Sequence, residues 1–237
     1  AGGDELFGGY PWRYHEAEEF QTWQQFLKIH FSFRHRSIQS SEVVKLLSKK
    51  IDFGDPNRPF QIFSQYFENF FDRKLDAFSI KKSVMNYDAR TFLPGLLTIE
   101  DKIGMNFSLE TRFPFLDNNL VDLVTALQLV EGNRELPKHS YDFQDGKKIL
   151  RVIASKYFPS FVSRRKKQGF IGPDSEWFRS EYANSYFKRF FLSESILWEY
   201  LNKDFTESIF IQHQNRITDR RHFIWSILFL KYWFDGV

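Results

Sequence analysis

Apolar side chains recur at helical spacing along most of the chain, and they predict a mainly α-helical fold. The helices that this spacing predicts cover residues 12–33, 40–50, 60–75, 78–92, 96–110, 118–127, 148–158, 174–191 and 218–234. Neither a series of alternating strands nor an internal repeat is visible in the pattern.

Turn-forming residues separate these helices. Leu93-Pro94-Gly95 is expected to end the helix over 78–92, and Asn118 or Asn119 to cap the next long helix. The residues before Pro114 are expected to be extended, because a proline pushes the preceding residue out of the helical region. The polar stretch 131–147 is predicted to be a loop.

Composition narrows the class of protein. Hydrophobic residues make up 42% and aromatic residues 19%, which is typical of a globular chain. A net charge of +3 gives little reason to expect nucleic-acid binding. The absence of cysteine excludes disulfides and thiolate catalysis within these residues, and it fits a cytoplasmic location. The longest apolar run, Phe223 to Leu230, is far shorter than the roughly 20 residues of a membrane span, so we expect no membrane partner.

The first ten residues, AGGDELFGGY, combine four glycines with two adjacent acids. Glycines let a backbone approach a ligand closely, and Asp4 and Glu5 offer carboxylate oxygens, so the turn suits Mg²⁺ and phosphate. The plainer alternative, which the pattern alone favours, is a glycine-rich turn before a helix that starts near Trp12. Because a native N-terminus rarely starts on a ligand-binding turn, we expect the chain to be the C-terminal part of a longer protein.

Two further groups of charged residues carry candidate chemistry. Glu100 and Asp101 precede Glu110 and Arg112 on a predicted helix, where they could face one cleft or form a solvated face. Four consecutive cations over 164–167 lead into Gln-Gly-Phe. One lysine of that run could turn toward a phosphate while its neighbours stay in water.

Taken together and in order, these motifs resemble the asparagine synthetase family. The stretches that carry the resemblance are GGDELFGGY from Gly2, EDK from Glu100, SLETRFPFLD from Ser108, GKKILR from Gly146 and RKKQGF from Arg165. The resemblance spans about residues 1 to 180 and continues into the closing helices.

The resemblance implies a fold and a set of partners. Residues 1–237 would form the helical second half of an α/β ATP-pyrophosphatase-type synthetase domain, whose SGG-x-DS loop lies upstream. Such enzymes use ATP and Mg²⁺ to activate a carboxylate as an acyl-adenylate. Ammonia from a glutaminase domain of the same full-length chain then replaces AMP. That glutaminase domain needs an N-terminal cysteine and is therefore expected outside this chain. A homodimer is an allowed assembly.

The resemblance also implies roles at the phosphate side of the site. Asp4 would help to hold Mg²⁺, with Gly2 and Gly3 close to the phosphates. Lys167 would stabilise the charge that develops on pyrophosphate. Lys166 is the alternative if the loop register is shifted by one residue.

At the acceptor side, the resemblance places Glu5 near the substrate carboxylate. Glu110 is expected as a catalytic residue. Arg112, Glu100 and Asp101 are expected to bind substrate or to order the cleft.

The chain departs from the family pattern at Ala1, where the family often carries an acid, and in the stretch 96–99. Residues 96–99 supply neither the Asp nor the Arg that helps bacterial asparagine synthetases to recognise aspartate. Aspartate stays the acceptor that the resemblance favours. Amidation of a sugar acid, cyclisation through an internal amine and a non-catalytic helical interaction module stay open.

Overall fold

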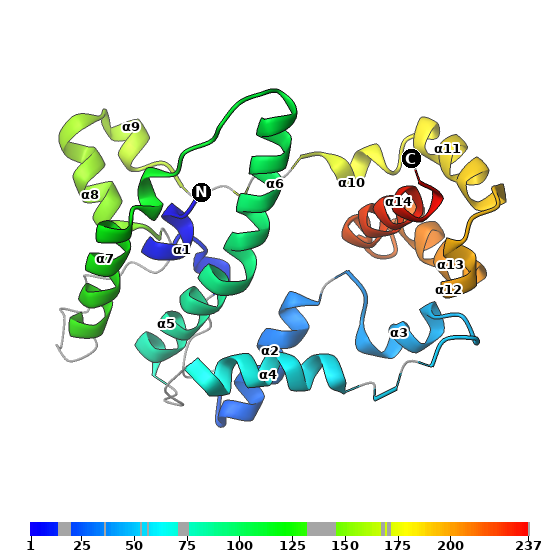
Figure 1. Ribbon diagram of the computed structural model, residues 1–237, viewed down its shortest axis with the longest axis horizontal. Helices are drawn as coiled ribbons and strands as arrows, with labels where there is room; N and C mark the ends of the chain where they lie inside the picture. Colours follow the sequence, from blue (N-terminus) through cyan, green and yellow to red (C-terminus); the bar gives the residue numbers. More distant parts are fainter. Residues whose placement is uncertain are drawn as a thin grey trace. The chain divides into compact units, whose positions relative to one another are not determined.

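The computed structural model describes residues 1–13, 20–35, 37–52, 54–55, 57–70, 76–131, 146–166, 169 and 172–236. Within these ranges the chain is mainly helical and contains no strand, which confirms the expected fold class. The chain divides into two compact units, shown in Figure 1. The first unit comprises Ala1–Phe26 and Ser64–Gln168, and the second comprises Leu27–Phe63 and Gly169–Val237.

Two helices, α2 (Trp23–Arg34) and α4 (Arg58–Phe70), each contribute residues to both units. The other helical elements of the first unit are α1 (Gly3–Phe7), η1 (Pro11–Arg13), α5 (Ala77–Tyr87), the π-helical turn η3 (Asp88–Phe92), α6 (Leu93–Asn106), η4 (Pro114–Leu116), α7 (Asn118–Glu131), α8 (Lys148–Tyr157) and α9 (Ser160–Ser163). Those of the second unit are α3 (Ser40–Leu46), α10 (Asp174–Trp177), α11 (Glu181–Leu192), α12 (Leu197–Tyr200), α13 (Lys203–Gln214) and α14 (Arg221–Asp235).

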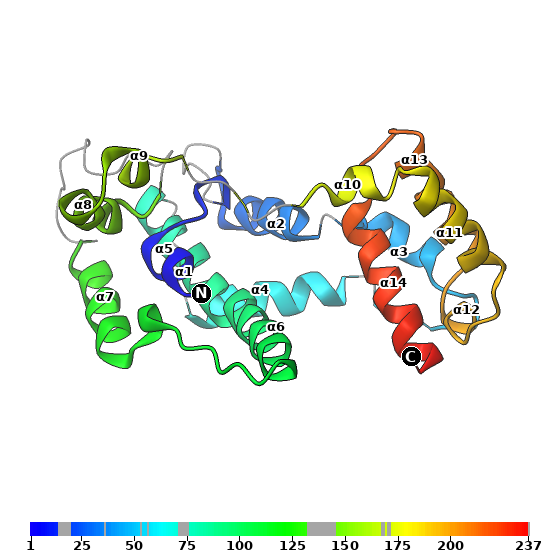
Figure 2. The same ribbon diagram turned by 90° about the horizontal axis from the view of Figure 1, so that it is seen from above.

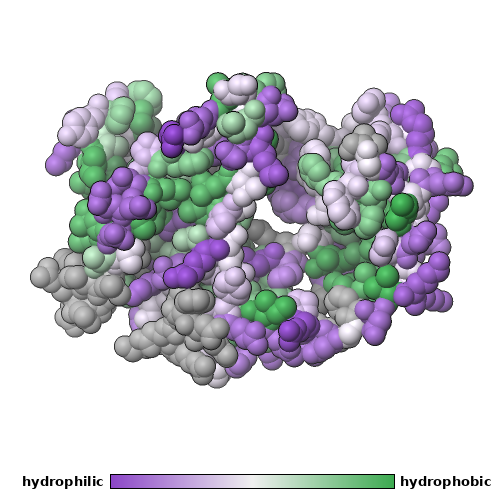
Figure 3. Space-filling model, in the orientation of Figure 1, coloured by the Kyte–Doolittle hydropathy of each residue, from purple (hydrophilic) through white to green (hydrophobic). Residues whose placement is uncertain are grey.

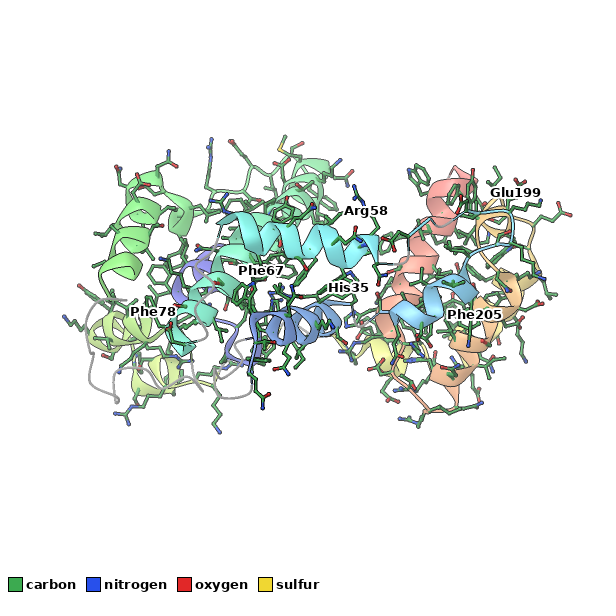
Figure 4. The ribbon with its side chains drawn as sticks, turned by 90° about the horizontal axis from the view of Figure 1, so that it is seen from below. His35, Arg58, Phe67, Phe78, Glu199 and Phe205 are labelled. Atoms are coloured by element: carbon green, nitrogen blue, oxygen red, sulfur yellow. The ribbon has the colours of Figure 1, made fainter. Side chains whose placement is uncertain are left out.

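Aromatic packing forms the interior of the first unit. Phe67 is fully buried, and its ring lies 4.9 Å from that of Tyr87 and 5.8 Å from that of Phe26, measured between centroids. Figure 4 shows Phe67 on the side of α4 that faces α2. Large aromatic side chains contribute much of the apolar area that a helical core buries, so these contacts hold α2, α4 and α5 together.

The second unit has a larger aromatic core, built mainly by α11, α13 and α14. Phe187 and Phe210 lie at its centre, with their ring centroids 4.2 Å apart. The buried residues Ile209 and Ile224 fill the space around them. The sequence pattern predicts the helical regions that contain Phe187 and Ile224, but not α13, which contributes Ile209 and Phe210.

Several predicted helix boundaries are wrong, for local reasons. The segment 78–106 does not stop at Pro94, because the π-helical turn η3 comes first and leaves Pro94 in the opening turn of α6. A proline is tolerated in that position, where its missing N–H would have no helical partner. Helix α2 begins only at Trp23, after Thr22, whose hydroxyl oxygen accepts a hydrogen bond from the Gln25 amide at 3.2 Å.

Two more helices begin at a capping residue that the sequence pattern does not predict. Helix α7 is capped by Asp117 rather than by an asparagine, because the Asp117 carboxylate accepts a hydrogen bond from the Asn119 amide at 3.0 Å. The predicted helix over 174–191 is broken at Ser180, which caps α11 through the Ala183 amide at 3.2 Å. Helices α12 and α13 were not expected from the pattern.

Apolar side chains are also exposed on the first unit. Figure 3 shows apolar surface there, in the orientation of Figure 1. The exposed large apolar residues of α6 to α9 include Ile99, Ile103, Leu123, Leu127, Ile149, Val152, Ile153, Tyr157 and Phe161. In the part of the chain that the structure describes, no helix is both long and apolar enough to cross a membrane.

Candidate functional site

The glycine-rich turn folds as the short helix α1 between two glycines with left-handed backbone. Gly2, before the helix, has φ 89°, and Gly8, after it, has φ 67°. A Cβ atom on Gly2 would lie only 2.4 Å from Cδ2 of Leu116. The first glycine is therefore required both by its backbone angle and by its neighbour. Helix α1 contacts α5, α7 and α8 and lies inside the first unit (Figure 1).

The start of α8 is docked on this turn. The Asp4 carboxylate pairs with the Lys147 ammonium, with Oδ1 and Nζ 2.9 Å apart. The Lys147 amide also donates to the Phe7 carbonyl at 3.0 Å. Gly146 has φ 56°, and a Cβ atom there would lie 2.5 Å from the Gly8 carbonyl oxygen. Close backbone contact and an ion pair therefore hold the two segments together.

Gly9 makes the ion pair sterically feasible. Its amide donates to the Asp4 carbonyl at 2.7 Å. A Cβ atom on Gly9 would lie 1.9 Å from the Asp4 Oδ1 atom and 2.4 Å from Cε of Lys147. The sequence shows Lys147 within the GKKILR motif, but spacing alone assigned it no role, because its partner is more than a hundred residues away.

Glu5 faces the interior. Its side chain is 3% exposed and accepts a hydrogen bond from the Tyr10 hydroxyl at 2.6 Å. Burial and then the hydrogen bond to Glu5 raise the pKa of Tyr10 well above its usual range, so the phenol stays protonated and donates. Arg13 lies over the Tyr10 ring, 3.9 Å from its centroid, and pairs with Asp88 at 3.1 Å. The expected role of Glu5 toward a substrate stays a prediction.

Glu110 and Arg112 lie beyond the end of a helix, not on it. Helix α6 ends at Asn106, and the Leu109 amide closes back on the Gly104 carbonyl at 3.0 Å, so the expected helix over 96–110 is too long by one turn. The carboxylate of Glu110 and the guanidinium of Arg112 are 2.6 Å apart, and both side chains are mostly exposed. The expected roles of Glu110 and Arg112 toward a substrate stay predictions.

The remaining predicted site residues make fewer contacts that bear on their expected roles. Glu100 and Asp101 are exposed on α6. Gly3 packs against the Phe115 ring, which its Cβ would approach to 3.3 Å. Lys166 is described and exposed, whereas Lys167 lies outside the described residues. The structure thus brings Gly2, Gly3, Asp4 and Glu5 together, and it adds Lys147 to them.

The described residues offer limited means to hold a metal. No group of three or more His, Asp or Glu side chains is assembled among them. Asp4 could give a carboxylate oxygen, which suits Mg²⁺ when phosphate oxygens and water complete its six ligands. The donor set therefore fits a metal that arrives with a phosphate ligand rather than one caged by the protein alone.

Comparison with known proteins identifies a family for nearly the whole chain and individual relatives for about two thirds of it. The family described as asparagine synthase matches residues 1–235. The chain is 30% identical over 149 residues to asparagine synthetase (glutamine-hydrolyzing) 1 of Bacillus subtilis strain 168, a match covering 62% of this chain and 22% of that protein. It is 27% identical over 178 residues to asparagine synthetase (glutamine-hydrolyzing) 3 of the same organism, covering 69% and 24%.

These matches cover a larger share of this chain than of its relatives. The chain spans about a quarter of the length of these curated relatives. No solved structure gives a significant match. The five motifs that carry the resemblance all lie within the matched range, so the family match agrees with them.

Proposed function

The chain belongs to the asparagine synthase family, and from this premise we propose that it forms part of an ATP-dependent amidotransferase. In the proposed reaction an acceptor carboxylate attacks the α-phosphorus of ATP. The bond from that phosphorus to the bridging oxygen breaks, and pyrophosphate leaves. Ammonia then attacks the acyl carbon of the acyl-adenylate, and AMP departs with the former carboxylate oxygen.

The observation that carries this proposal is the Asp4–Lys147 pair on the glycine-rich turn. The glycines of this turn allow close packing around a single carboxylate, which already holds one cationic side chain. Asp4 would supply one oxygen to Mg²⁺, and the ion, when bound, would neutralise charge on the phosphates. Lys147 adds a positive charge at 2.9 Å from the same carboxylate.

Further roles follow from the family pattern. Lys167 would stabilise the charge that leaves with pyrophosphate, because a lysine acts there as a point charge. Gly2 and Gly3 would let the backbone approach the phosphates. Glu110 would act in the amidation half of the site, next to Arg112.

Aspartate is the acceptor that we propose. The support is that the two Bacillus subtilis relatives are asparagine synthetases. Against it stands the stretch 96–99, which has neither of the polar residues expected for recognising aspartate. The acceptor is therefore the part of the proposal that most needs a direct experiment.

The test is ATP-dependent pyrophosphate release by the full native polypeptide. Aspartate would be compared with a panel of sugar acids, each with and without ammonium, and the products would be identified by mass spectrometry. We expect release that requires aspartate, with asparagine and AMP as products when ammonium is present.

Other results would decide between the alternatives. Release with a different carboxylate only would keep the mechanism and replace the acceptor. Release without ammonium, with a cyclic product, would indicate an internal amine. No release with any acid would contradict the proposed function and favour a helical interaction module.

A further inference from the structure

One guanidinium, that of Arg151 on the first turns of α8, binds three backbone carbonyls. Its Nε donates to the Gly146 carbonyl at 3.0 Å. Its Nη1 donates to the carbonyl of Ser163 at 2.9 Å and to that of Arg165 at 2.8 Å. Hydrogen bonds from a charged donor are stronger than neutral ones, and a planar guanidinium can hold several acceptors in a fixed geometry.

The three carbonyls belong to two different segments. Gly146 is the residue whose backbone packs against Gly8 of the glycine-rich turn. Ser163 and Arg165 belong to the segment 163–166, in which α9 ends and the run of cations begins. Arg151 therefore ties the segment that touches the turn to the segment that starts the basic run.

Local structure explains why the segment 163–166 needs such a partner. Helix α9 spans only Ser160–Ser163, so few of its carbonyl oxygens accept a hydrogen bond from an N–H of the same helix. Ser163 itself is buried, while Arg164 to Lys166 are exposed. Helices α8 and α9 lie side by side in both views of the ribbon (Figures 1 and 2), which brings the Arg151 side chain within reach.

From these contacts we propose that Arg151 is a positioning residue, which fixes the segment 163–166 relative to the turn that carries Asp4. Lys167 follows this segment directly in the sequence. Without the guanidinium, the backbone of 163–166 loses two hydrogen bonds to α8, while Asp4 and Lys147 keep their own contacts. The catalytic consequence rests on the proposed function, but the structural consequence does not.

The structural consequence can be measured by amide hydrogen exchange on the full native polypeptide. Arg151→Ala should speed exchange at the amides of 163–166 by about tenfold or more. The carbonyls of Ser163 and Arg165 each lose a charge-assisted hydrogen bond, so this backbone opens to solvent more often. Arg151→Lys should give a smaller increase in exchange, because the ammonium keeps one charged donor. Some increase should remain, because one ammonium cannot replace the fork of donors. The matched control is Lys156→Ala, which removes an exposed cation from the last turn of the same helix.

The result expected is faster exchange confined to 163–166, with α5 and the Lys156→Ala protein unchanged. Unchanged exchange at 163–166 in Arg151→Ala would overturn the proposal. Faster exchange throughout the first unit would also overturn it, because Arg151 would then support the whole unit rather than this segment.

A second readout separates positioning from general stability. In carboxylate-dependent pyrophosphate release, Arg151→Ala should lower kcat by about tenfold or more with a smaller change in KM for ATP, and added guanidinium at non-denaturing concentration should restore part of kcat. Normal kcat in Arg151→Ala would overturn the catalytic part. If the wild-type protein releases no pyrophosphate, the proposed function fails, and the exchange experiment still decides the role of Arg151.

Discussion

At the residue scale, the site depends on a pairing between Asp4 and Lys147 that lies within reach of solvent. The Asp4 side chain is 21% exposed and that of Lys147 is 28% exposed, so neither charge is deeply desolvated. An ion pair of this kind contributes little to stability but sets where each charge lies. The pair therefore matters more for what can bind beside it than for the free energy of unfolding.

The substitution Asp4→Asn tests this view. It keeps the size of the side chain but removes the anionic oxygen that would bind Mg²⁺ with a phosphate chain. We expect pyrophosphate release to fall by about a hundredfold or more, since metal-assisted charge stabilisation is worth several kcal/mol. Thermal unfolding should change little. The matched control, Asp122→Asn on the exposed face of α7, should leave both quantities unchanged.

Two results would contradict this assignment. Full activity in Asp4→Asn would mean that the carboxylate takes no part in the reaction. A large loss of stability in Asp4→Asn would mean that the pair with Lys147 is mainly structural.

At the scale of elements, the glycine-rich turn and the start of α8 form one unit of backbone contacts. The local pattern of four glycines around two acids predicts a turn here, whereas residues 3–7 form the short helix α1 between positive-φ glycines. The sequence also predicts α8 within one residue of its observed end at Tyr157. The docking of α8 on the turn could not be predicted, because a contact between residues 9 and 147 leaves no local periodicity.

Two helix boundaries could not be predicted from the sequence either. The end of α6 at Asn106 depends on Ser108 adopting φ 57°, a backbone conformation that serine seldom takes. The break at Ser180 depends on a capping hydroxyl that also fits a helix interior. Propensity is similar on both sides of such choices, so one capping hydrogen bond or one backbone angle decides them.

The substitution Gly9→Ala tests the contact between the elements. The added methyl would meet the Asp4 carboxylate and the Lys147 side chain, at 1.9 Å and 2.4 Å in the present geometry. We expect a loss of about 1–3 kcal/mol in unfolding free energy from overpacking, together with reduced pyrophosphate release. Chemical denaturation and the pyrophosphate assay measure the two effects.

Gly95→Ala is the matched control, because a Cβ atom on Gly95 in α6 would meet no atom within 4 Å. Its unfolding free energy should stay equal or rise by up to about 1 kcal/mol, as expected when a helical glycine gains a side chain. Equal behaviour of the two alanine variants would contradict the close contact at Gly9.

At the scale of the whole molecule, the predicted site residues and the large aromatic core lie in different units. The first unit holds the predicted residues of the site that the structure describes, and the second holds the large aromatic core. A histidine lies in that core. His213 is fully buried, its Nδ1 accepts a hydrogen bond from the Arg220 amide at 3.0 Å, and its Nε2 lies 3.0 Å from the Ser175 carbonyl. These contacts fit a neutral ring with the proton on Nε2.

This arrangement predicts how stability depends on pH. Burial, the largest cause, lowers the pKa of His213 below its ordinary value of 6.5. Below pH 6.5 the histidine therefore binds a proton more readily in the unfolded chain than in the folded chain. The contribution of His213 to folding stability is complete above pH 6.5 and decreases as pH falls toward the folded pKa. Denaturant unfolding between pH 8 and pH 5 should show this loss, at no more than about 1.4 kcal/mol per pH unit.

His213→Gln provides the comparison, because glutamine does not titrate in this range. The variant should be less stable than wild type at pH 8 and should lose less stability than wild type on acidification. Parallel pH profiles for the two proteins would show that His213 does not cause the pH dependence.

We propose that this chain takes part in activating a carboxylate with ATP. The most direct measurement is carboxylate-dependent exchange of labelled pyrophosphate into ATP by the full native polypeptide, without ammonia, beside its Lys167→Ala and Lys166→Ala variants. We expect exchange in wild type, its loss in Lys167→Ala and near-normal exchange in Lys166→Ala. Loss in Lys166→Ala alone would shift the assignment by one residue. Absence of exchange in wild type with every carboxylate would contradict the proposed activation of a carboxylate.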